Sequence, residues 1–318
     1  MAFLTGSKQM DDEDKTAKNL FMTTLMQNNI LITGAYGQLG NEMKRVSKGN
    51  DNFIFYFTDA DTLDITDRNA IDTFVREKHI RYIINCAAYT AVDKAEDDCD
   101  LCYKINRDAV INLGVVASKY NAKIIHVSTD YVFDGTANSP YKETDTVCPT
   151  SVYGKSKAEG EQELLKVCPD SIIIRTAWLY SIFGNNFVKT MIKLGQERET
   201  LNVVADQTGT PTCANDLAKA IIKILEYSEA NGFREGIYHF SDEGITTWYD
   251  FTLQIHKDAG ITTCKVNPIT TDQYPTKAAR PKYSVLDKAK IKKTFDVVLP
   301  KWEDSLKICI EELSATQE

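Results

Sequence analysis

Short apolar runs alternate with amphipathic segments along the chain from residue 29 to residue 240. Runs of about five mostly apolar residues are typical of strands buried on both faces of a parallel sheet. Segments with apolar residues every three or four positions are typical of the helices between such strands. Strands are predicted at 29–33, 53–58, 81–86, 123–127, 171–176, 201–205 and 236–240. Helices are predicted at 41–48, 68–78, 100–120, 151–167, 186–195 and 214–227.

This alternation predicts an α/β fold, a Rossmann-type doubly wound parallel sheet with a smaller C-terminal α/β lobe. The βα rhythm stops after residue 240, where helices are predicted at 247–259 and 299–313. We interpret the change as a lobe that binds substrate. The Rossmann domain is assigned to 28–177, with returning segments near 201–230, and the substrate lobe mainly to 178–200 and 231–318. The polar residues 1–27 are interpreted as an extension without a functional role.

A glycine-rich turn follows the first predicted strand directly. Gly34, Gly37 and Gly40 allow a tight turn, close approach of a ligand to the backbone and close packing of helix on strand. Free N–H groups at the start of the next helix can then bind a pyrophosphate. Asp59 ends the second strand, 19 residues after Gly40, near the spacing expected for a carboxylate on the adenosine ribose. The pattern predicts a dinucleotide site; the alternative is a plain tight turn in which Asp59 only caps a strand.

Further residues are expected along the same edge of the sheet. Ala87 and Ala88 leave the carboxyl end of the strand at 81–86, where ligands lie in open parallel sheets. Their small side chains would admit a cofactor, although ordinary close packing explains them equally well. Asp64 is consistent with a contact near the adenine or with a helix cap. Arg280, beside Pro281, has a side chain suited to binding an anionic group.

Three residues are typical of carbonyl–alcohol chemistry. Tyr153 and Lys157 are four residues apart on a predicted helix, so their side chains share one face. An ammonium next to a phenol favours the phenolate and lowers its pKa, which is near 10 in water. Thr129, at the end of the strand before this helix, offers a hydroxyl for the same substrate oxygen. The pair could donate a proton to a ketone oxygen, provided that another group delivers a hydride.

Composition excludes several other classes of protein. A formal net charge of −8 argues against a nucleic-acid or anionic-membrane surface, and no run approaches the length of a membrane span. Residues 1–18 do not resemble a signal peptide. The eight cysteines are scattered, and Cys99 with Cys102 forms a Cys-x-x-Cys pair without a second pair to complete a zinc site. We expect a cytoplasmic protein without disulfides.

Longer sequence motifs narrow the interpretation to one family. They lie at 32–40, 87–96, 128–135, 152–157, 175–178, 206–212 and 279–281. Together with the glycine turn and the Thr–Tyr–Lys set, they resemble the dTDP-4-dehydrorhamnose reductase family of the extended short-chain dehydrogenase/reductase superfamily. The resemblance covers about residues 28–315.

The resemblance implies reduction of the C4 ketone of dTDP-4-dehydro-L-rhamnose to dTDP-L-rhamnose with NADPH or NADH, a step toward surface polysaccharide. It implies that Thr129, Tyr153 and Lys157 are catalytic, with Tyr153 the general acid and Lys157 on the nicotinamide ribose. It implies that the cofactor is bound by Gly34, Gly37, Gln38, Leu39, Gly40, Asp59, Asp64, Ile65, Ala87, Ala88, Tyr89, Tyr153 and Lys157. It implies that the sugar nucleotide is bound by Thr129, Asp130, Trp178 and Arg280.

Some relatives are dimers linked by magnesium through carboxylates. The resemblance therefore suggests a homodimer, and it makes a Mg²⁺ site a question for this sequence. Glu42 fits one ligand position, but Asn215 stands where a second carboxylate would be expected, so we predict no metal site. Asp59 favours NADH, whereas Lys44 and Arg45 either reach a 2′-phosphate or lie on the helix surface.

Two alternatives remain from the sequence. A sugar-nucleotide dehydratase or epimerase shares the fold, but such dehydratases carry Asp-Glu after the Thr, and here Thr129 is followed by Asp130 and Tyr131. The second alternative is a non-catalytic binding partner like the regulatory subunit of methionine adenosyltransferase. The intact Thr–Tyr–Lys set argues against it.

Overall fold

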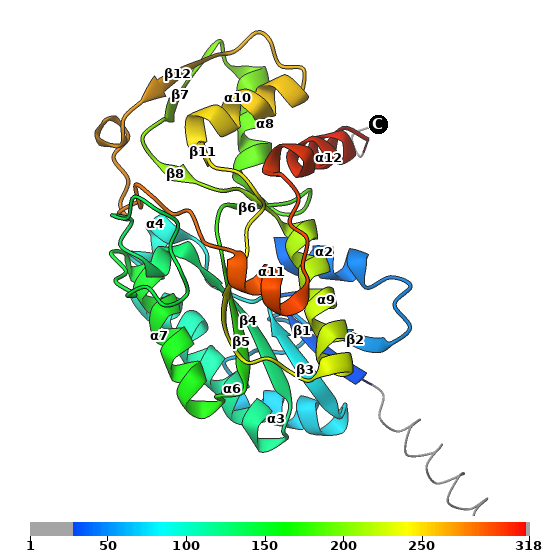
Figure 1. Ribbon diagram of the computed structural model, residues 1–318. Coiled ribbons are helices and arrows are strands. Elements are labelled where there is room, and N and C mark those ends of the chain that lie inside the picture. The colour runs from blue at the N-terminus through cyan, green and yellow to red at the C-terminus, as the bar shows by residue number, and fades with distance from the viewer. Residues whose placement is uncertain (1–27, 316–318) are drawn as a thin grey trace, which may run out of the picture.

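The large lobe is built on a six-stranded parallel sheet with strand order β10-β5-β4-β3-β1-β2 (Figure 1). The computed structural model describes residues 28–315, so the extension expected at 1–27 lies outside the described residues. The strands are β1 (Asn28–Thr33), β2 (Phe53–Phe57), β3 (Ile80–Asn85), β4 (Lys123–Thr129), β5 (Ser171–Thr176) and β10 (Gly236–His239). The strand order reverses between β1 and β3, which confirms the doubly wound arrangement that the alternating pattern predicts.

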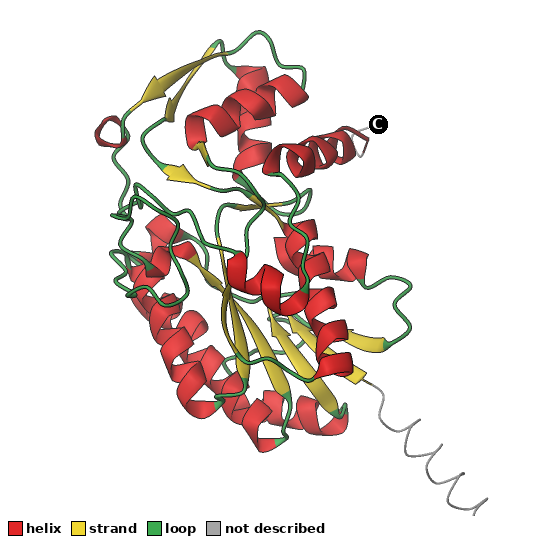
Figure 2. Ribbon diagram, in the orientation of Figure 1, coloured by secondary structure: helices red, strands yellow, loops and turns green. Residues whose placement is uncertain are grey.

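Helices cover both faces of this sheet (Figures 1 and 2). α2 (Gln38–Val46) and α9 (Ala214–Asn231) pack together on one face. α3 (Arg68–Glu77), α6 (Ala109–Lys119) and α7 (Val152–Val167) cover the other. Because both faces are buried, the strands carry adjacent apolar residues, and this is why short apolar runs locate them in the sequence.

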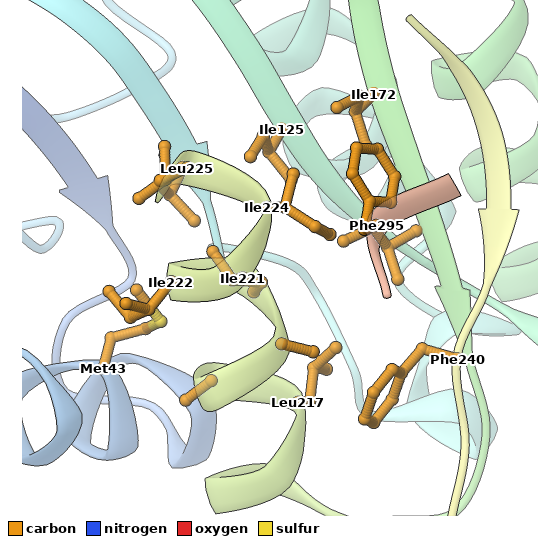
Figure 3. Packing of buried hydrophobic residues seen from close by; sticks show 14 of the residues in the cluster. Met43, Ile125, Ile172, Leu217, Ile221, Ile222, Ile224, Leu225, Phe240 and Phe295 are labelled. Atoms are coloured by element: carbon orange, nitrogen blue, oxygen red, sulfur yellow. The ribbon is translucent and has the colours of Figure 1, made fainter. Parts of the chain in front are cut away.

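Successive residues of β1 point to opposite faces, as in any strand. Ile30 and Ile32 belong to the core under α2 and α9, whereas Leu31 belongs to the core under α3 and α6. Figure 3 shows the first of these cores, with side chains of α9 such as Ile221 and Ile224 gathered against the sheet. The strand edge that carries the site is thus held between two packed layers.

The smaller lobe lies beyond the carboxyl ends of the strands (Figure 1). It contains three two-stranded sheets: β7 with β12, parallel; β6 with β9, parallel; and β8 with β11, antiparallel. Their bounds are β6 (Leu179–Tyr180), β7 (Thr200–Val204), β8 (Thr208–Gly209), β9 (Thr212–Cys213), β11 (Thr246–Thr247) and β12 (Lys265–Ile269). Helices α8 (Phe187–Glu197), α10 (Trp248–Asp258) and α12 (Trp302–Ala315) pack around a separate apolar core.

Two segments belong to a different lobe from the one to which the predicted boundaries assign them. β7 pairs with β12 in the small lobe, so only α9 of the span 201–230 packs on the large sheet. β10 adds to the edge of that sheet, and α11 (Ala289–Phe295) packs beside it, although both fall within 231–318. The chain therefore crosses between the lobes several times. A βα rhythm read along the sequence does not reveal with which strand a given strand pairs.

The helix predicted over 100–120 is interrupted. α5 (Cys99–Tyr103) and α6 are joined by a π-helical turn over Lys104–Asp108. Ile105, predicted to lie in the core, belongs to this wider turn and is partly exposed. Shorter elements are α4 (Val92–Ala95) and the 3₁₀ turns Asp130–Val132 and Thr271–Gln273. Within residues 28–315, none of the helices combines the length and apolar character needed to cross a membrane.

Candidate active site

Two adjoining cavities lie at the carboxyl ends of the parallel strands. One, of about 410 Å³, lies over β1, β2 and β3, and the other, of about 500 Å³, lies over β4 and β5 and faces the small lobe. Gly37, Cys86 and Ala88 line both, so the cavities are parts of one cleft. This is the edge at which open parallel sheets bind ligands, next to the point where strand order reverses.

The glycine turn forms the middle of the cleft. Gly34 has φ +66°, and a Cβ there would lie 2.6 Å from the Ala87 nitrogen, so only glycine fits. A Cβ on Gly40 would lie 2.2 Å from the Gly34 carbonyl oxygen, so Gly40 serves packing and does not line either cavity. The turn and the helix are in the predicted places, but the helix begins earlier than predicted. Gly37 is its N-cap, and Asn41 N–H already donates to the Gly37 carbonyl at 3.0 Å.

The first residues of α2 therefore face the cleft with unpaired backbone N–H groups. Gly37, Gln38 and Leu39 line the larger cavity. No side chain caps this helix, so its N–H groups and dipole are available to a phosphate. These features fit the pyrophosphate of a dinucleotide.

Asp59, Asp64 and Ile65 all line the smaller cavity, as expected for the adenosine side. The Asp59 carboxylate accepts hydrogen bonds from the backbone N–H of Tyr36 at 2.8 Å and of Ala60 at 2.8 Å. Asp64 accepts from its own turn, at Thr66 N–H, and the cap of α3 is Asp67. The cap role weighed for Asp64 therefore belongs to another residue.

The predicted catalytic residues line the larger cavity together with Asp130 and Trp178. Thr129 is the last residue of β4, and its hydroxyl donates to Asp130 Oδ1 at 2.9 Å. Ser151 caps α7 by accepting from Gly154 N–H at 3.1 Å, and this fixes the start of the helix that carries Tyr153 and Lys157. The structure thus brings the predicted residues into one cavity, and their catalytic roles stay predictions.

The pKa of Tyr153 is shifted opposite to expectation. The side chain is 8% exposed, and burial raises the pKa of its phenol well above the usual value, which outweighs a lowering contribution from the Thr129 hydroxyl. Tyr153 therefore keeps its proton throughout the neutral range. The net shift is opposite to the lowering predicted from Lys157 because burial of the phenol dominates.

Lys157 is buried and points into the protein. Its Nζ donates to the backbone carbonyl of Val127 at 2.7 Å and lies 3.3 Å from His126 Nε2. Burial lowers the pKa of Lys157 to about 8, against an opposing influence of the Glu161 carboxylate. Both the ammonium and the amine are thus accessible near neutral pH, which makes Lys157 sensitive to the groups around it.

An aromatic cluster closes the cavity on the side of the small lobe. Trp178 has φ +50°, unusual for a bulky residue, and its ring stacks on Trp248 with centroids 3.5 Å apart. Phe187 packs against Trp248 in turn. Gly209 lies against the other side of this stack, since a Cβ there would lie 2.6 Å from the Trp178 ring. Trp248 was missed because the sequence placed it at the start of an ordinary helix.

Besides Gly40, two expected residues do not line either cavity. Arg280 donates to Asp93 Oδ2 at 2.6 Å, so the guanidinium expected to bind an anion is paired with a carboxylate. Tyr89 donates through its hydroxyl to Asp98 at 3.3 Å. The side chains of both residues have other partners.

α5 and the π-helical turn after it contribute residues that sequence reasoning missed. Leu101 of α5 and Lys104 and Ile105 of the turn line the smaller cavity. The same turn brings Asn106 inward, where it donates to the Tyr89 carbonyl at 3.0 Å and accepts from the Tyr89 N–H at 2.8 Å. No periodic pattern marks a single wide turn, so these residues carried no signal in the sequence.

The carboxylate of Glu42, considered above as a magnesium ligand, already accepts hydrogen bonds from the protein. Glu42 is buried and receives hydrogen bonds from Ser181, Asn215 and Arg45. Among residues 28–315 there is no cluster of three or more potential metal-ligating side chains. Cys102 contacts Ser156 and Asn106 rather than Cys99.

Comparison with known proteins gives the same picture over the whole described chain. A family model described as the RmlD substrate binding domain matches residues 28–315. The chain is 44% identical over 284 residues to the dTDP-4-dehydrorhamnose reductase of Aggregatibacter actinomycetemcomitans, covering 87% of this chain and 97% of that protein.

Solved structures agree. A dTDP-4-dehydrorhamnose reductase of Clostridium acetobutylicum superposes with a TM-score of 0.85 at 46% identity, covering 90% of this chain and 99% of that one. A dTDP-4-dehydrorhamnose reductase of Bacillus anthracis, solved in complex with NADP, also gives 0.85, at 39% identity, covering 90% of this chain and 100% of that one.

Proposed function

The chain belongs to the dTDP-4-dehydrorhamnose reductase family of the extended short-chain dehydrogenase/reductase superfamily, and from this premise we propose which of its residues carry the activity. The activity is the NAD(P)H-dependent reduction of the C4 ketone of dTDP-4-dehydro-L-rhamnose to dTDP-L-rhamnose, within dTDP-L-rhamnose biosynthesis. The observation that carries the assignment of residues is that Thr129, Tyr153 and Lys157 share one wall of the cavity over β4 and β5.

Tyr153 is the proton donor. When bound, a reduced nicotinamide supplies the hydride, and the ketone oxygen gains negative charge as the hydride arrives. The phenol keeps its proton in the neutral range because the side chain is buried. It is therefore in the protonated form needed for proton donation before the substrate binds. Thr129 holds the same oxygen once its hydroxyl, which donates to Asp130 Oδ1 in the structure, turns toward the substrate. Together the two donors stabilise the developing charge.

Lys157 holds the sugar of the nicotinamide nucleoside and assists the return of a proton to Tyr153. Its nitrogen is fixed by the Val127 carbonyl, at the floor of the cavity that Tyr153 lines. The unpaired N–H groups at the start of α2 hold the pyrophosphate, and Asp59 holds the adenosine ribose.

We assign both NADPH and NADH as reductants. The related enzyme of Bacillus anthracis was solved with NADP. Asp59 favours NADH, because a carboxylate repels a 2′-phosphate. Lys44 offsets this repulsion: its ammonium lies 4.8 Å from the ring centre of Tyr36, whose backbone N–H binds Asp59. Arg45, in contrast, faces Glu42 and Glu312 and is directed away from the adenosine side.

The small lobe holds the sugar nucleotide. Trp178 and Asp130 line the cavity on the substrate side, and the stack of Trp178 on Trp248 supports a rigid apolar wall against the deoxysugar. Arg280 is assigned to the dTDP group only if its pairing with Asp93 opens on binding. A homodimer stays a prediction that sedimentation would test.

The test is an assay of nicotinamide oxidation. Purified protein should oxidise NADPH, and NADH, with dTDP-4-dehydro-L-rhamnose and yield a dTDP-6-deoxyhexose. The D-configured dTDP-4-dehydro-6-deoxyglucose serves as the comparison substrate. Protein that binds NADPH but oxidises it with neither sugar would contradict the proposal, and faster oxidation with the D-sugar would reassign the substrate.

A further inference from the structure

His126 lies directly beneath the catalytic lysine, in a position that none of the roles above explains. It is a residue of β4, three before Thr129, and its side chain is completely buried. Its ring has two polar neighbours. Nδ1 lies 2.9 Å from Asn85 Nδ2, and Nε2 lies 3.3 Å from Lys157 Nζ. The imidazole thus joins the amide of a neighbouring strand to the lysine.

The orientation of Asn85 follows from its own partners. Its Oδ1 accepts from the Thr33 hydroxyl at 2.7 Å and from the backbone N–H of Ala87 at 3.2 Å. A backbone N–H can only donate, so the oxygen of Asn85 must face Ala87 and its NH₂ must face His126. The NH₂ group also only donates. His126 Nδ1 is therefore an acceptor, and the proton of the neutral imidazole is on Nε2.

That proton points at Lys157. An ammonium nitrogen has donors and no lone pair, so it cannot accept a hydrogen bond from Nε2–H. A neutral amine has one lone pair, which can accept from His126 while an N–H still donates to the Val127 carbonyl at 2.7 Å. The imidazole is buried, and its pKa lies well below the usual value, so it stays neutral while the lysine titrates.

We propose that His126 is a positioning residue for the reduction, which presents its Nε2–H to Lys157 and thereby favours the amine of Lys157 over the ammonium. The role in catalysis rests on the function proposed above; the protonation pattern does not. Through this contact the interior of the sheet sets the fraction of Lys157 that carries charge, and with it the strength with which the cleft attracts an anionic dinucleotide.

Other charged and titratable groups near the lysine act in the opposite direction. Glu161, one turn further along α7, favours the ammonium, as does the Cys102 thiol of α5. The carboxylate of Glu161 is itself paired with Arg175 of β5, and this pairing weakens its pull. The phenol of Tyr153 faces the same cavity and stays neutral. Burial of the lysine and its direct contact with the imidazole are therefore the features that oppose the charge.

The first experiment reads the tautomer. Long-range ¹H–¹⁵N correlation spectra of uniformly ¹⁵N-labelled full-length protein distinguish the two neutral tautomers of an imidazole from the imidazolium. The chain has only four histidines, and the His126 signals are identified by their absence from His126→Gln. We expect the Nε2–H tautomer between pH 6 and 9. An Nδ1–H tautomer, or an imidazolium in this range, would overturn the proposal.

The second experiment tests the protonation of Lys157. In His126→Gln a side-chain carbonyl can face Lys157, so the ammonium gains an acceptor in place of a donor. The pH above which the Kd for NADPH rises should move upward by about one unit, a tenfold change in proton affinity. The basic limb of the pH profile of kcat/KM should move with it.

The matched control is His239→Gln. His239 is a buried histidine in β10 whose Nδ1 donates to the Tyr141 carbonyl at 3.1 Å, away from Lys157. It should lower the melting temperature and leave both pH profiles unchanged. If His126→Gln behaves as His239→Gln does, His126 is merely structural and the proposal fails.

A second variant covers the case in which His126→Gln does not fold. His126→Asn keeps an acceptor for Asn85 and reaches less far toward the lysine, so it should shift the same profiles upward by a smaller amount. An unchanged profile overturns the proposal here too. If the wild type binds NADPH but fails to reduce dTDP-4-dehydro-L-rhamnose, the proposed function fails, while the tautomer and the NADPH titration still decide the role of His126.

Discussion

Arg175 and Glu161 form a two-pronged ion pair inside the protein, between β5 and α7. Arg175 Nη2 lies 2.6 Å from Glu161 Oε2, and Arg175 Nε lies 3.0 Å from Oε1. Both side chains are at most 3% exposed. Glu161 follows Lys157 by one turn on α7, the helix that carries Tyr153 and Lys157. Removing one partner of such a pair leaves the other charge buried without compensation.

We therefore expect Glu161→Gln to lower the free energy of unfolding by about 3 kcal/mol. Urea denaturation followed by circular dichroism measures the change. The control is Glu159→Gln on the same helix, because Glu159 pairs with Arg107 at the surface, where ion pairs contribute at most about 1 kcal/mol. Equal losses in the two variants would show that burial of the pair does not matter.

Tyr153→Phe removes the proposed proton donor and keeps the ring. We expect kcat to fall by a factor on the order of 10² to 10⁴, since general acid catalysis contributes about that much. The Kd for NADPH should change little, because the phenol is assigned to the substrate oxygen. Tyr103→Phe, which removes a hydroxyl bonded to Glu159 on the outside of the same region, is the control. Turnover that survives in Tyr153→Phe would refute the assignment of the general acid.

Asp130 predicts a dependence of stability on pH. Burial raises the pKa of its carboxyl to about 6 in the folded protein, from an ordinary value near 3.8. The folded state therefore binds the extra proton more tightly than the unfolded state does. The destabilising effect of the charged carboxylate is absent below pH 4, develops between about pH 4 and 6, and is complete above pH 6.

Asp130→Asn removes that effect. It should stabilise the fold by roughly 1–3 kcal/mol at pH 8 and hardly at all at pH 4, while activity falls. The comparison is Asp134→Asn: hydrogen bonds lower the pKa of Asp134, so its carboxylate stabilises the fold above pH 4, and its loss should destabilise at pH 8. Melting temperatures of both variants at the two pH values test the signs, and a gain for Asp130→Asn at pH 4 as large as that at pH 8 would count against this account.

Asp59 and Lys44 should shift the choice of reductant in opposite directions. Asp59→Asn removes a charge that repels a 2′-phosphate, so the ratio of kcat/KM for NADPH to that for NADH should rise by several-fold up to about tenfold, which corresponds to about 1.4 kcal/mol. Lys44→Ala should lower the ratio. Asp61→Asn changes the charge nearby on a residue that lines neither cavity and should leave the ratio unchanged. Shifts of the same sign for Asp59→Asn and Lys44→Ala would disprove the electrostatic explanation.

Much of the fold could be predicted because its strands are buried on both faces. The run 171–176 holds three successive isoleucines and is buried at every position, and β5 has the predicted bounds. The catalytic half of the cleft could be predicted as well, because Thr129 ends a strand and Tyr153 shares a helical face with Lys157.

The remainder depends on contacts between distant segments. Pairing of β7 with β12, the stack of Trp178 on Trp248 and the contact of His126 with Asn85 each join residues far apart in the chain. The direction of the shift in the pKa of Tyr153 depends on burial, which is a property of the packed protein. Local patterns carry no information of either kind.

The position of α9 in the chain has a consequence for synthesis on the ribosome. The sheet face that includes Ile30, Ile32 and Ile125 is covered by α9, which begins at residue 214, and the sheet edge is completed by β10. A nascent chain that has delivered only the first five strands therefore exposes an apolar sheet face for as long as the following segment is being translated. At about 5–20 residues per second this interval lasts several seconds, and we expect it to be the period in which the growing chain engages a chaperone.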